Sequence, residues 1–319
     1  MENSKENYAF ARDVLIGLGN NPKRLFAKYI YDEAGSKLFE EIMDLPEYYL
    51  TRSEYEILKS HKHAFADVIG SEPFNLVELG AGNGEKTMIL LEHFLDRKLD
   101  FEYVPIDISS AAVEELTEKL DHQLPDLKIN GLIKDYFDGL RWLKNNSSRR
   151  NFILFMGANI GNLQPFELRQ FMQSLWLALH PEDLICIGFD LKKDYQKIRK
   201  AYDDSKGVTK QFNMNLLKRI NAELGGNFDL DKFEFYSSYN PVLGANEAYL
   251  VSLADQEVKV TELQKTFSFA QWEPIHTEYS FKFSIPEIEK IARDNGFEVI
   301  RHLFDSQYFF TDSIWKTIK

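Results

Sequence analysis

The feature that most constrains this chain is a glycine-rich turn that follows a short apolar run. Residues 74–79 (Phe-Asn-Leu-Val-Glu-Leu) lie between a proline and a glycine and predict a buried strand. Glycines occupy positions 80, 82 and 84, and residues 85–95 then predict a helix. Because glycine lets the backbone approach a ligand closely, this strand, turn and helix indicate the nucleotide-binding entry of a doubly wound α/β fold.

The spacing of the glycines separates two kinds of nucleotide site. A dinucleotide site has the pattern G-x-G-x-x-G, with a helix N-terminus at the pyrophosphate. Residues 78–84 have instead E-x-G-x-G-x-G, the pattern of methyltransferases that depend on S-adenosylmethionine (SAM). At the strand end, Glu78 can meet the ammonium group of the cofactor's methionine moiety. A tight loop without a cofactor is the alternative interpretation of this turn taken alone.

Composition limits the other classes of function. With 319 residues the chain can form one large domain or two small ones, and its net charge of −12 argues against a nucleic-acid partner. No apolar run approaches the roughly 20 residues of a membrane span, and the first residues lack the regions of a signal peptide. The single cysteine, Cys186, lies in an apolar run and is interpreted as a buried strand residue. We therefore expect a monomeric cytoplasmic protein with a small-molecule substrate and no membrane partner.

After the turn, strands and helices alternate as a parallel sheet requires. The sequence predicts strands at 101–106, 128–133, 151–156 and 184–190, with helices at 53–68, 111–120 and 165–179. Asp107 follows the second strand of the sheet, where an acid can accept hydrogen bonds from ribose hydroxyls. Asp135 and Tyr136 follow the third strand, where an acid can meet the adenine amino group and an aromatic ring can stack on the base.

The pattern changes after about residue 194. Ser284 and Glu287 form a capping box that predicts a helix ending near residue 295. The other predicted elements are helices at 195–202 and 210–224 and strands at 248–252, 258–269, 277–283, 297–304 and 307–315. We therefore predict a SAM-binding domain from residues 56–194 and 285–319, and a substrate-binding lobe from residues 1–55 and 195–284.

Segments along nearly the whole chain also carry a family resemblance. They are Tyr31-Asp-Glu-Ala-Gly-Ser-Lys-Leu-Phe39, Leu45-Pro-Glu-Tyr-Tyr49, Glu78-Leu-Gly80 through Glu85-Lys-Thr87, Ile160-Gly-Asn-Leu163, Asp190-Leu-Lys-Lys-Asp194, Ala201-Tyr-Asp-Asp204 with Gly207-Val-Thr209, Phe212-Asn213, Asn227-Phe-Asp-Leu-Asp231 and Thr277-Glu-Tyr-Ser280. In their order and spacing the chain resembles the histidine-specific α-N-methyltransferases of ergothioneine biosynthesis. The resemblance implies a Rossmann-like class I SAM-dependent methyltransferase sheet with a second α+β substrate-binding lobe.

The resemblance also implies an activity, a cofactor and a site. The activity is SAM-dependent methylation of the α-amine of free L-histidine, continued to the trimethylated betaine hercynine. The cofactor-binding residues carried over by position are Glu78, Gly80, Gly82, Lys86, Asp107, Asp135 and Tyr136. Asn162 and Tyr202 would hold the substrate carboxylate and orient the amine, with Tyr31 completing the catalytic set. The remaining substrate contacts would be Tyr48, Gly157, Glu278 and Ser280, the last two at the imidazole.

The chemistry of this reaction agrees with the residue types. Methyl transfer from a sulfonium is an in-line displacement, so the enzyme mainly has to position a neutral amine. A carboxylate beside a hydroxyl can fix one tautomer of an imidazole or hold its cation. Tyrosines around the amine can accommodate a quaternary ammonium product by cation–π contact. The seven histidines lack metal-ligand spacing, so we predict no metal site.

Two departures from the family pattern leave alternatives open. Ala248 stands where the histidine enzymes have the larger methionine, and the smaller alanine would widen the pocket for the substrate side chain. In addition, Ala158-Asn159 replaces the usual Ser-Thr before Ile160, near the amine. The substrate could therefore be another amino acid, such as tryptophan or a modified histidine, although Glu278 and Ser280 favour histidine. A SAM-binding regulatory protein without turnover is the alternative from another class. Taken singly, each site residue also has an ordinary structural interpretation, as a packing tyrosine, a turn asparagine or a surface lysine.

Overall fold

The chain divides into two compact units in the computed structural model, which describes residues 2–319, with side chains from Tyr8 onward. Unit 1 comprises the residues up to Tyr49 together with Lys193–Phe281, and unit 2 comprises Leu50–Lys192 and Lys282–Lys319. The boundaries proposed from the sequence, at residues 55, 194 and 284, lie a few residues further along the chain. Within residues 2–319, no helix is both long enough and apolar enough to cross a membrane.

Unit 2 is built on a seven-stranded sheet in the order β12-β13-β6-β5-β2-β3-β4. Its strands are β2 (Phe74–Leu79), β3 (Phe101–Asp107), β4 (Leu132–Ile133), β5 (Arg150–Phe155), β6 (Leu184–Asp190), β12 (Phe297–Phe304) and β13 (Phe310–Thr317). β13 runs antiparallel to both β6 and β12, whereas the other pairs are parallel. Every residue of β2 and β6 is buried, which is the pattern of parallel strands covered on both faces.

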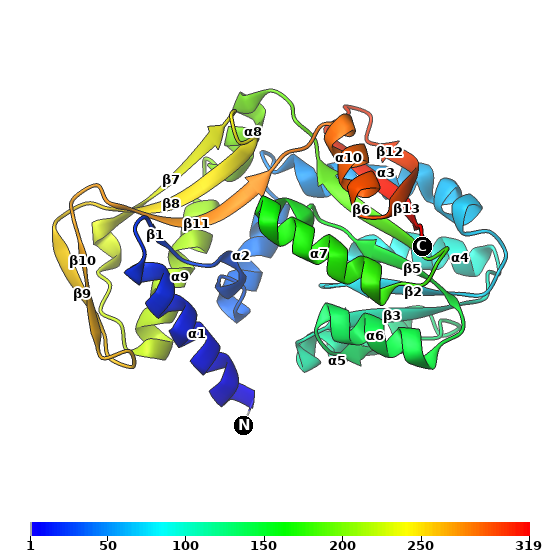
Figure 1. Cartoon of the computed structure of the whole chain (residues 1–319), viewed down its shortest axis with the longest axis horizontal. Helices are drawn as coiled ribbons and strands as arrows, with labels where there is room; N and C mark the ends of the chain where they lie inside the picture. Colours follow the sequence, from blue (N-terminus) through cyan, green and yellow to red (C-terminus); the bar gives the residue numbers. More distant parts are fainter. Residues whose placement is uncertain (1) are drawn as a thin grey trace. The chain divides into compact units, whose positions relative to one another are not determined.

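The helices of unit 2 lie on both faces of this sheet (Figure 1). They are α3 (Tyr49–Ile69, whose first residue belongs to unit 1), α4 (Glu85–Asp96), α5 (Ser110–Gln123), α6 (Tyr136–Asn146), α7 (Pro165–Ala178) and α10 (Ile285–Asp294), with a short 3-10 helix, η2 (Asn159–Asn162). The predicted capping box at the start of α10 is confirmed: Ser284 and Glu287 bond each other's backbone nitrogens.

The strand order creates a topological switch point at β2, which pairs in parallel with β3 on one side and with β5 on the other. Ligands of open α/β sheets bind in the crevice at the carboxyl ends of the strands at such a point. Gly80 directly follows β2 with φ of +72°, and Gly157 lies just beyond β5 with φ of +78°. The two glycine turns therefore lie at the switch point.

Unit 1 is built on a four-stranded sheet in the order β1-β11-β8-β7. Its strands are β1 (Lys23–Arg24), β7 (Phe233–Asn240), β8 (Ala245–Ser252) and β11 (Pro274–Phe281), and a separate hairpin is formed by β9 (Gln256–Val260) and β10 (Lys265–Phe269). The helices are α1 (Glu2–Gly19), α2 (Glu33–Met43), α8 (Tyr195–Tyr202) and α9 (Val208–Leu224), with 3-10 turns η1 (Ala27–Tyr29) and η3 (Leu230–Lys232). α9 packs against β7, β8 and α2 and has ten buried residues, so it forms the centre of this unit's core.

Some predicted elements differ from the structure. The single strand predicted over 258–269 was wrong, because Gln264 has a positive φ and the segment turns back as the β9–β10 hairpin. The strand predicted over 128–133 is reduced to β4, with only an isolated bridge from Ile129 to Tyr103 before it. The sequence patterns also missed β7 and α6. α6 begins at Tyr136, directly after Asp135, which is both a predicted cofactor residue and the N-cap of this helix.

Within unit 2, the chain segment that leaves β6 lies beside the segment that returns before α10. The amide of Phe283 donates to the Asp190 carbonyl at 2.9 Å, and the amide of Lys192 donates to the Phe283 carbonyl at 2.8 Å. The ammonium of Lys282 pairs with the Asp190 carboxylate at 2.7 Å, and neither side chain is exposed to solvent. The whole segment 193–281 of unit 1 is therefore inserted between two adjoining points of the unit 2 sheet.

Candidate functional site

The glycine turn after β2 is shaped by close packing at one position and open space at another. A Cβ atom at Gly80 would lie 2.6 Å from the Tyr136 hydroxyl, and the positive φ at this residue also disfavours a side chain. A Cβ atom at Gly82 would meet no described atom within 4 Å. At Gly82 no side chain covers the backbone, so a ligand can approach it there, which agrees with the SAM site predicted from the sequence.

Glu78 lies at the base of this turn and is buried. One carboxylate oxygen accepts a hydrogen bond from Thr87 Oγ1 at 2.6 Å, and the other accepts one from the Tyr103 hydroxyl. Burial raises the pKa of the Glu78 carboxyl, while these two hydrogen bonds oppose the rise. These contacts anchor the strand end to α4 and β3. The predicted contact between Glu78 and the methionine ammonium stays a prediction.

Three further predicted cofactor residues gather at the ends of β3 and β4. Asp107 is the last residue of β3, and its carboxylate accepts the Ser109 amide at 2.9 Å. Asp135 is the N-cap of α6, and its Oδ1 atom accepts the amides of the second and third helical residues, each at 3.0 Å. Tyr136 begins that helix, and burial, with Asp107 nearby, raises the pKa of its hydroxyl to about 12. Gly80, Asp107 and Tyr136 are therefore neighbours.

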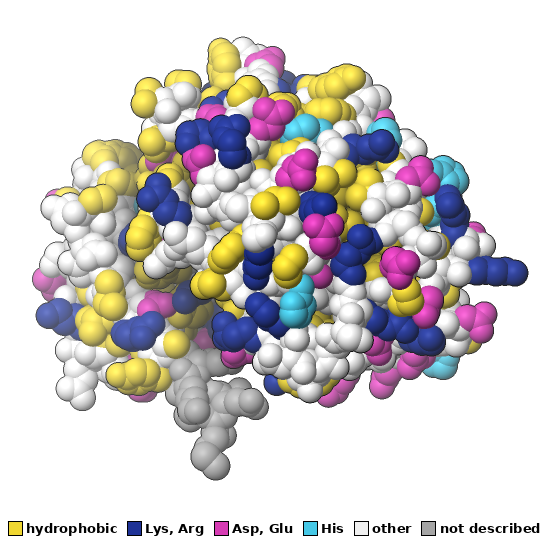
Figure 2. All heavy atoms as spheres, turned by 45° about the vertical axis from the view of Figure 1, so that its right-hand side comes forward, with side chains coloured by type: hydrophobic (Ala, Val, Ile, Leu, Met, Phe, Trp, Pro, Cys, Tyr) yellow, Lys and Arg dark blue, Asp and Glu magenta, His cyan; other side chains and the backbone are white. Residues whose placement is uncertain are grey.

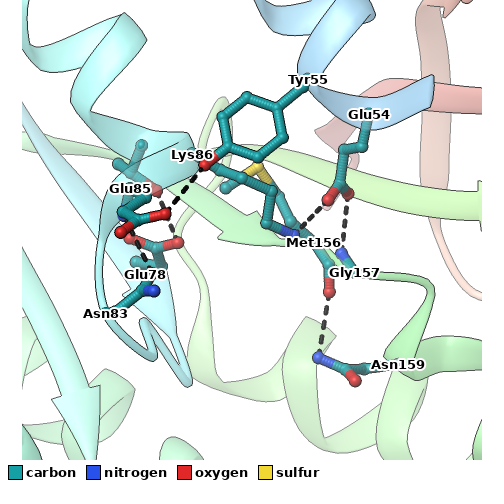
Figure 3. Close-up of polar contacts among 10 residues, drawn as sticks. Glu54, Tyr55, Glu78, Asn83, Glu85, Lys86, Met156, Gly157 and Asn159 are labelled. Carbon is teal, nitrogen blue, oxygen red and sulfur yellow. Dashed lines mark hydrogen bonds and ion pairs between the residues drawn. The ribbon is translucent and has the colours of Figure 1, made fainter. Parts of the chain in front are cut away.

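Lys86 does not extend into solvent as an ordinary surface lysine would. Its ammonium group pairs with the Glu54 carboxylate, and the other Glu54 oxygen accepts the amide of Gly157 at 2.7 Å (Figure 3). A Cβ atom at Gly157 would lie 3.6 Å from the Lys86 nitrogen, so the glycine is favoured by its positive φ rather than by crowding. Lys86 and Gly157, predicted for cofactor and substrate respectively, lie on the two sides of the switch point.

Asn162 ends the short η2 helix that follows Gly157. Ala158, the N-cap of η2, has φ of +59° and ψ of +20°, a left-handed conformation that is uncommon for a residue with a Cβ atom. Asn159 fixes the same turn, since its side-chain amide donates to the Met156 carbonyl at 3.0 Å. The Ala158-Asn159 departure therefore shapes the turn that leads to Asn162. The predicted role of Asn162 at the substrate carboxylate is not tested by these contacts.

Unit 1 contains an aromatic cluster that includes three of the predicted substrate residues. Ring centroids lie 5.3 Å apart for Tyr31 and Phe212, 5.5 Å for Tyr31 and Phe39, 6.2 Å for Phe39 and Tyr48, and 6.3 Å for Tyr48 and Tyr202. Tyr31 keeps 40% of its surface exposed, whereas Tyr48 is buried. Edge-to-face arrangements of this kind present ring faces that can hold a cation.

Glu278 and Ser280 lie on β11 directly opposite Ala248 and Asn246 of β8. The residue spacing puts both on one face of the strand, as the sequence predicted. The Ser280 hydroxyl and the Tyr202 hydroxyl are 2.7 Å apart and hydrogen-bonded. Although the Tyr31 side chain is partly exposed, its hydroxyl end lies among neighbouring groups, and burial there, followed by the charge of Glu278, raises the pKa of the hydroxyl well above its ordinary value. Tyr31, Tyr202, Glu278 and Ser280 therefore form one polar set within unit 1.

The site residues that the sequence did not single out are Glu54, Phe39 and Phe212. The two phenylalanines lie in segments that carry the family resemblance, and their rings meet the Tyr31 ring edge-to-face, so the segments themselves were the available signal. Glu54 had no local signal. Among the residues whose side chains are described, no group of three or more His, Cys, Asp and Glu residues is placed to hold a metal ion.

Comparison with known proteins tests the family. The model of a family described as "Histidine-specific methyltransferase, SAM-dependent" matches residues 10–317. The chain belongs to this family of SAM-dependent methyltransferases. The chain is similar to the histidine N-alpha-methyltransferase of Mycolicibacterium smegmatis, with 36% identity over 275 residues, which cover 86% of this chain and 84% of the relative.

Two further proteins are similar to this chain over most of its length. The chain is 32% identical to ergothioneine biosynthesis protein 1 of Schizosaccharomyces pombe over 281 residues, which cover 85% of this chain and 36% of that protein. It is 26% identical to an L-tryptophan methyltransferase of Psilocybe serbica over 310 residues, which cover 89% of this chain and 86% of that protein. SAM is accordingly the cofactor of this family member, and the glycine turn of unit 2 agrees with that assignment.

Proposed function

We propose that this chain methylates the α-amine of free L-histidine with SAM and continues to trimethylhistidine, hercynine. The observation that carries the proposal is the polar set of unit 1, in which Glu278 and Ser280 share one face of β11 and Ser280 is bonded to Tyr202. A carboxylate and a hydroxyl at this spacing complement the two ring nitrogens of an imidazole. The family match and the relatives named above support the same substrate.

In this proposal the residues of unit 1 bind the amino acid. Glu278 accepts a hydrogen bond from an imidazole N–H, and Ser280, fixed by Tyr202, engages the second ring nitrogen. The hydrogen bond to Ser280 fixes the orientation of the Tyr202 ring. In this orientation Tyr202 helps to hold the carboxylate and orient the α-amine of the substrate. Tyr31 and Tyr48 offer ring faces on which a progressively methylated, cationic amine is stabilised.

The residues of unit 2 serve the cofactor and the substrate backbone. SAM supplies a methyl group activated by a sulfonium centre. The Gly80 and Gly82 turn receives the cofactor, with Asp107 placed for the ribose hydroxyls and Asp135 and Tyr136 for the adenine. Gly157 and Asn162 receive the amino-acid backbone. An α-amine has an ordinary pKa of about 8, so a partly desolvated pocket favours the neutral nucleophile.

An endpoint assay tests the proposal directly. The enzyme is incubated with SAM and a mixture of free amino acids, and all amines are followed by mass spectrometry. We expect histidine alone to gain three methyl groups. Methylation of a different amino acid would keep the reaction class and reject the substrate, and binding of SAM without any methylation would favour a regulatory protein.

A second candidate substrate, tryptophan or a modified histidine, is favoured by the small residues beside Glu278. The buried Ala248 lies directly opposite Glu278 on β8, and its partner on the other side, in β7, is Ser237. Two small side chains in adjacent strands occupy little volume beside the carboxylate, which favours a larger ring in the substrate. Ala248→Met tests this: the substitution should reduce turnover of a bulky amino acid more than turnover of histidine, and an equal reduction would reject the role of this position.

We also propose a monomer that acts on a small molecule in the cytoplasm. On the face drawn in Figure 2, Lys and Arg side chains are interspersed with Asp and Glu, which does not favour a polyanionic partner. Light scattering coupled to size-exclusion chromatography tests the oligomeric state, and a mass twice that of the 37.2 kDa chain would reject the monomer.

A further inference from the structure

Glu54 joins the two sides of the switch point through one carboxylate. It lies on α3 and is 1% exposed. One oxygen accepts the Gly157 amide beyond β5 at 2.7 Å, and the other holds the ammonium of Lys86 near the start of α4 (Figure 3). The loop predicted to contact the substrate backbone and the helix that follows the cofactor turn are therefore held by the same side chain.

The sheet below makes room for this carboxylate and places a second acid beside it. A Cβ atom at Gly188 of β6 would lie 2.6 Å from Glu54 Oε1, so the glycine admits the carboxylate onto the sheet. Asp312 of β13 is directly opposite Gly188. Asp312 is fully buried, and neither of its carboxyl oxygens has a hydrogen-bond partner within the described chain. An ionised carboxylate in such surroundings would be costly.

The charges of this cluster can be assigned. Burial raises the pKa of Asp312 well above its usual range, the Glu54 carboxylate raises it further, and Lys86 opposes the rise. Burial lowers the pKa of Lys86, but Glu54 reverses this through its charge and hydrogen bond, with smaller effects from Glu78 and Asp312, so the pKa is raised on balance. The cluster thus joins the Lys86–Glu54 ion pair to a buried acid, Asp312, whose surroundings favour the neutral form.

We propose that Glu54 is a positioning residue for methyl transfer, and that Asp312 is a reserve acid that takes over the negative charge when Glu54 cannot carry it. Glu54 acts through Lys86 and Gly157. The Asp312 carboxyl interacts electrostatically with both Glu54 and Lys86, and ionising both acids would place like charges together in a buried site, so a single negative charge is favoured there. Their effects on cofactor binding should therefore be non-additive. The proposal rests on the proposed function, because it takes the switch point to be the site of methyl transfer.

The test is a double-mutant cycle read by binding of S-adenosylhomocysteine, measured by calorimetry on the full chain. Glu54→Gln should weaken binding about tenfold, and Asp312→Asn about twofold. In the double variant the only remaining carboxylate near Lys86 is the more distant Glu78. Its affinity for S-adenosylhomocysteine should fall by more than about 100-fold, well beyond the product of the two single effects. Losses that simply multiply would overturn the reserve-acid role.

Glu56→Gln is the matched control, since Glu56 is on the same helix and accepts the Ser306 amide at 2.9 Å, which a glutamine oxygen can also accept. It should bind S-adenosylhomocysteine like the wild type. A loss in Glu54→Gln no greater than that in the control would overturn the positioning role. Thermal unfolding of each variant shows whether it is folded before its binding is interpreted.

A pH series on Glu54→Gln provides a second measurement that does not require the double variant to fold. In this variant the charge facing Lys86 has to come from Asp312, because Glu78 is engaged by Thr87 and Tyr103. The raised pKa of Asp312 means that it takes up a proton at a higher pH than an ordinary carboxyl, so binding by this variant should weaken as the pH is lowered, whereas wild-type binding should change little. Equal pH dependence in both proteins would overturn the proposal. Because this series measures cofactor binding alone, it remains decisive even if histidine is not the substrate.

Discussion

Replacing Glu278 by alanine should weaken histidine binding selectively. Glu278 is half-buried on β11, and its charge raises the pKa of Tyr31, so solvent does not screen it completely. A hydrogen bond that involves a charged group contributes about 1.5–3 kcal/mol, and we take about 2 kcal/mol for this partly buried carboxylate. At 1.4 kcal/mol per factor of ten, this predicts about a 30-fold rise in the Kd for histidine. The affinity for SAM should stay within about twofold, because Glu278 is proposed to contact the imidazole alone.

The assay is calorimetric titration of each variant with histidine and, separately, with S-adenosylhomocysteine. Glu234→Ala is the control, because Glu234 is exposed on β7 and pairs at 2.7 Å with Lys210, a contact that contributes little. It should leave both affinities unchanged. Equal losses for both ligands in Glu278→Ala would mean that the residue supports the fold, and an unchanged histidine affinity would refute the imidazole contact.

Three further predictions concern single features of the structure. Gly80→Ala places a Cβ atom at a residue with positive φ, where it would also clash with the Tyr136 hydroxyl, so binding of S-adenosylhomocysteine should weaken by more than about tenfold in calorimetry. Tyr202→Phe and Ser280→Ala remove the same 2.7 Å hydrogen bond, so each should raise the KM for histidine by about three- to tenfold and the double variant little more; additive losses would contradict the shared role. For Asp204, burial raises the pKa, but hydrogen bonds from the Thr209 amide at 2.7 Å and neighbouring amides outweigh it and lower the pKa. Asp204→Asn should therefore reduce the free energy of unfolding by about 2 kcal/mol at neutral pH. The difference in stability should shrink once the pH falls below about 3.9, the ordinary pKa of an unfolded-state aspartate, and it should vanish as the pH passes the lower pKa of folded Asp204. A difference that stays constant in acid unfolding curves would disprove this prediction.

The sequence predicted the elements whose signals are local. The strands 74–79 and 184–190 and the helix 195–202 have the predicted bounds, because continuous apolar runs and a well-placed Asp194 N-cap depend on neighbouring residues alone. The capping box at Ser284 is of the same kind. Glu278 and Ser280 were placed on one face of a strand by strand alternation together with the family resemblance, neither of which requires knowledge of the tertiary structure.

What the sequence missed depends on contacts between distant residues. Glu54 resembles any solvated glutamate of an amphipathic helix, because its partners Lys86 and Gly157 are 32 and 103 residues away. Asp312 in a terminal strand likewise gives no sign of being a buried acid. Helix α6 was overlooked because Asp135 was considered only as a ligand for adenine, although the same carboxylate caps the helix. A residue with two roles was thus assigned only one.

The way the chain enters and leaves segment 193–281 has an evolutionary consequence. The two ends of this segment emerge side by side from unit 2, where backbone hydrogen bonds and the buried Lys282–Asp190 pair fasten them together. Most of unit 1 is thus a cassette with adjacent ends, and one cassette can be exchanged for another without redirecting the cofactor unit. Substitutions within the cassette can therefore change the surroundings of Glu278, Ser280 and Tyr202 without interrupting the unit 2 sheet. Because α2 packs on α9 and β1 pairs with β11, a transplanted segment 193–281 would need the matching residues before Tyr49 to complete unit 1, with Asp190 and Lys282 kept.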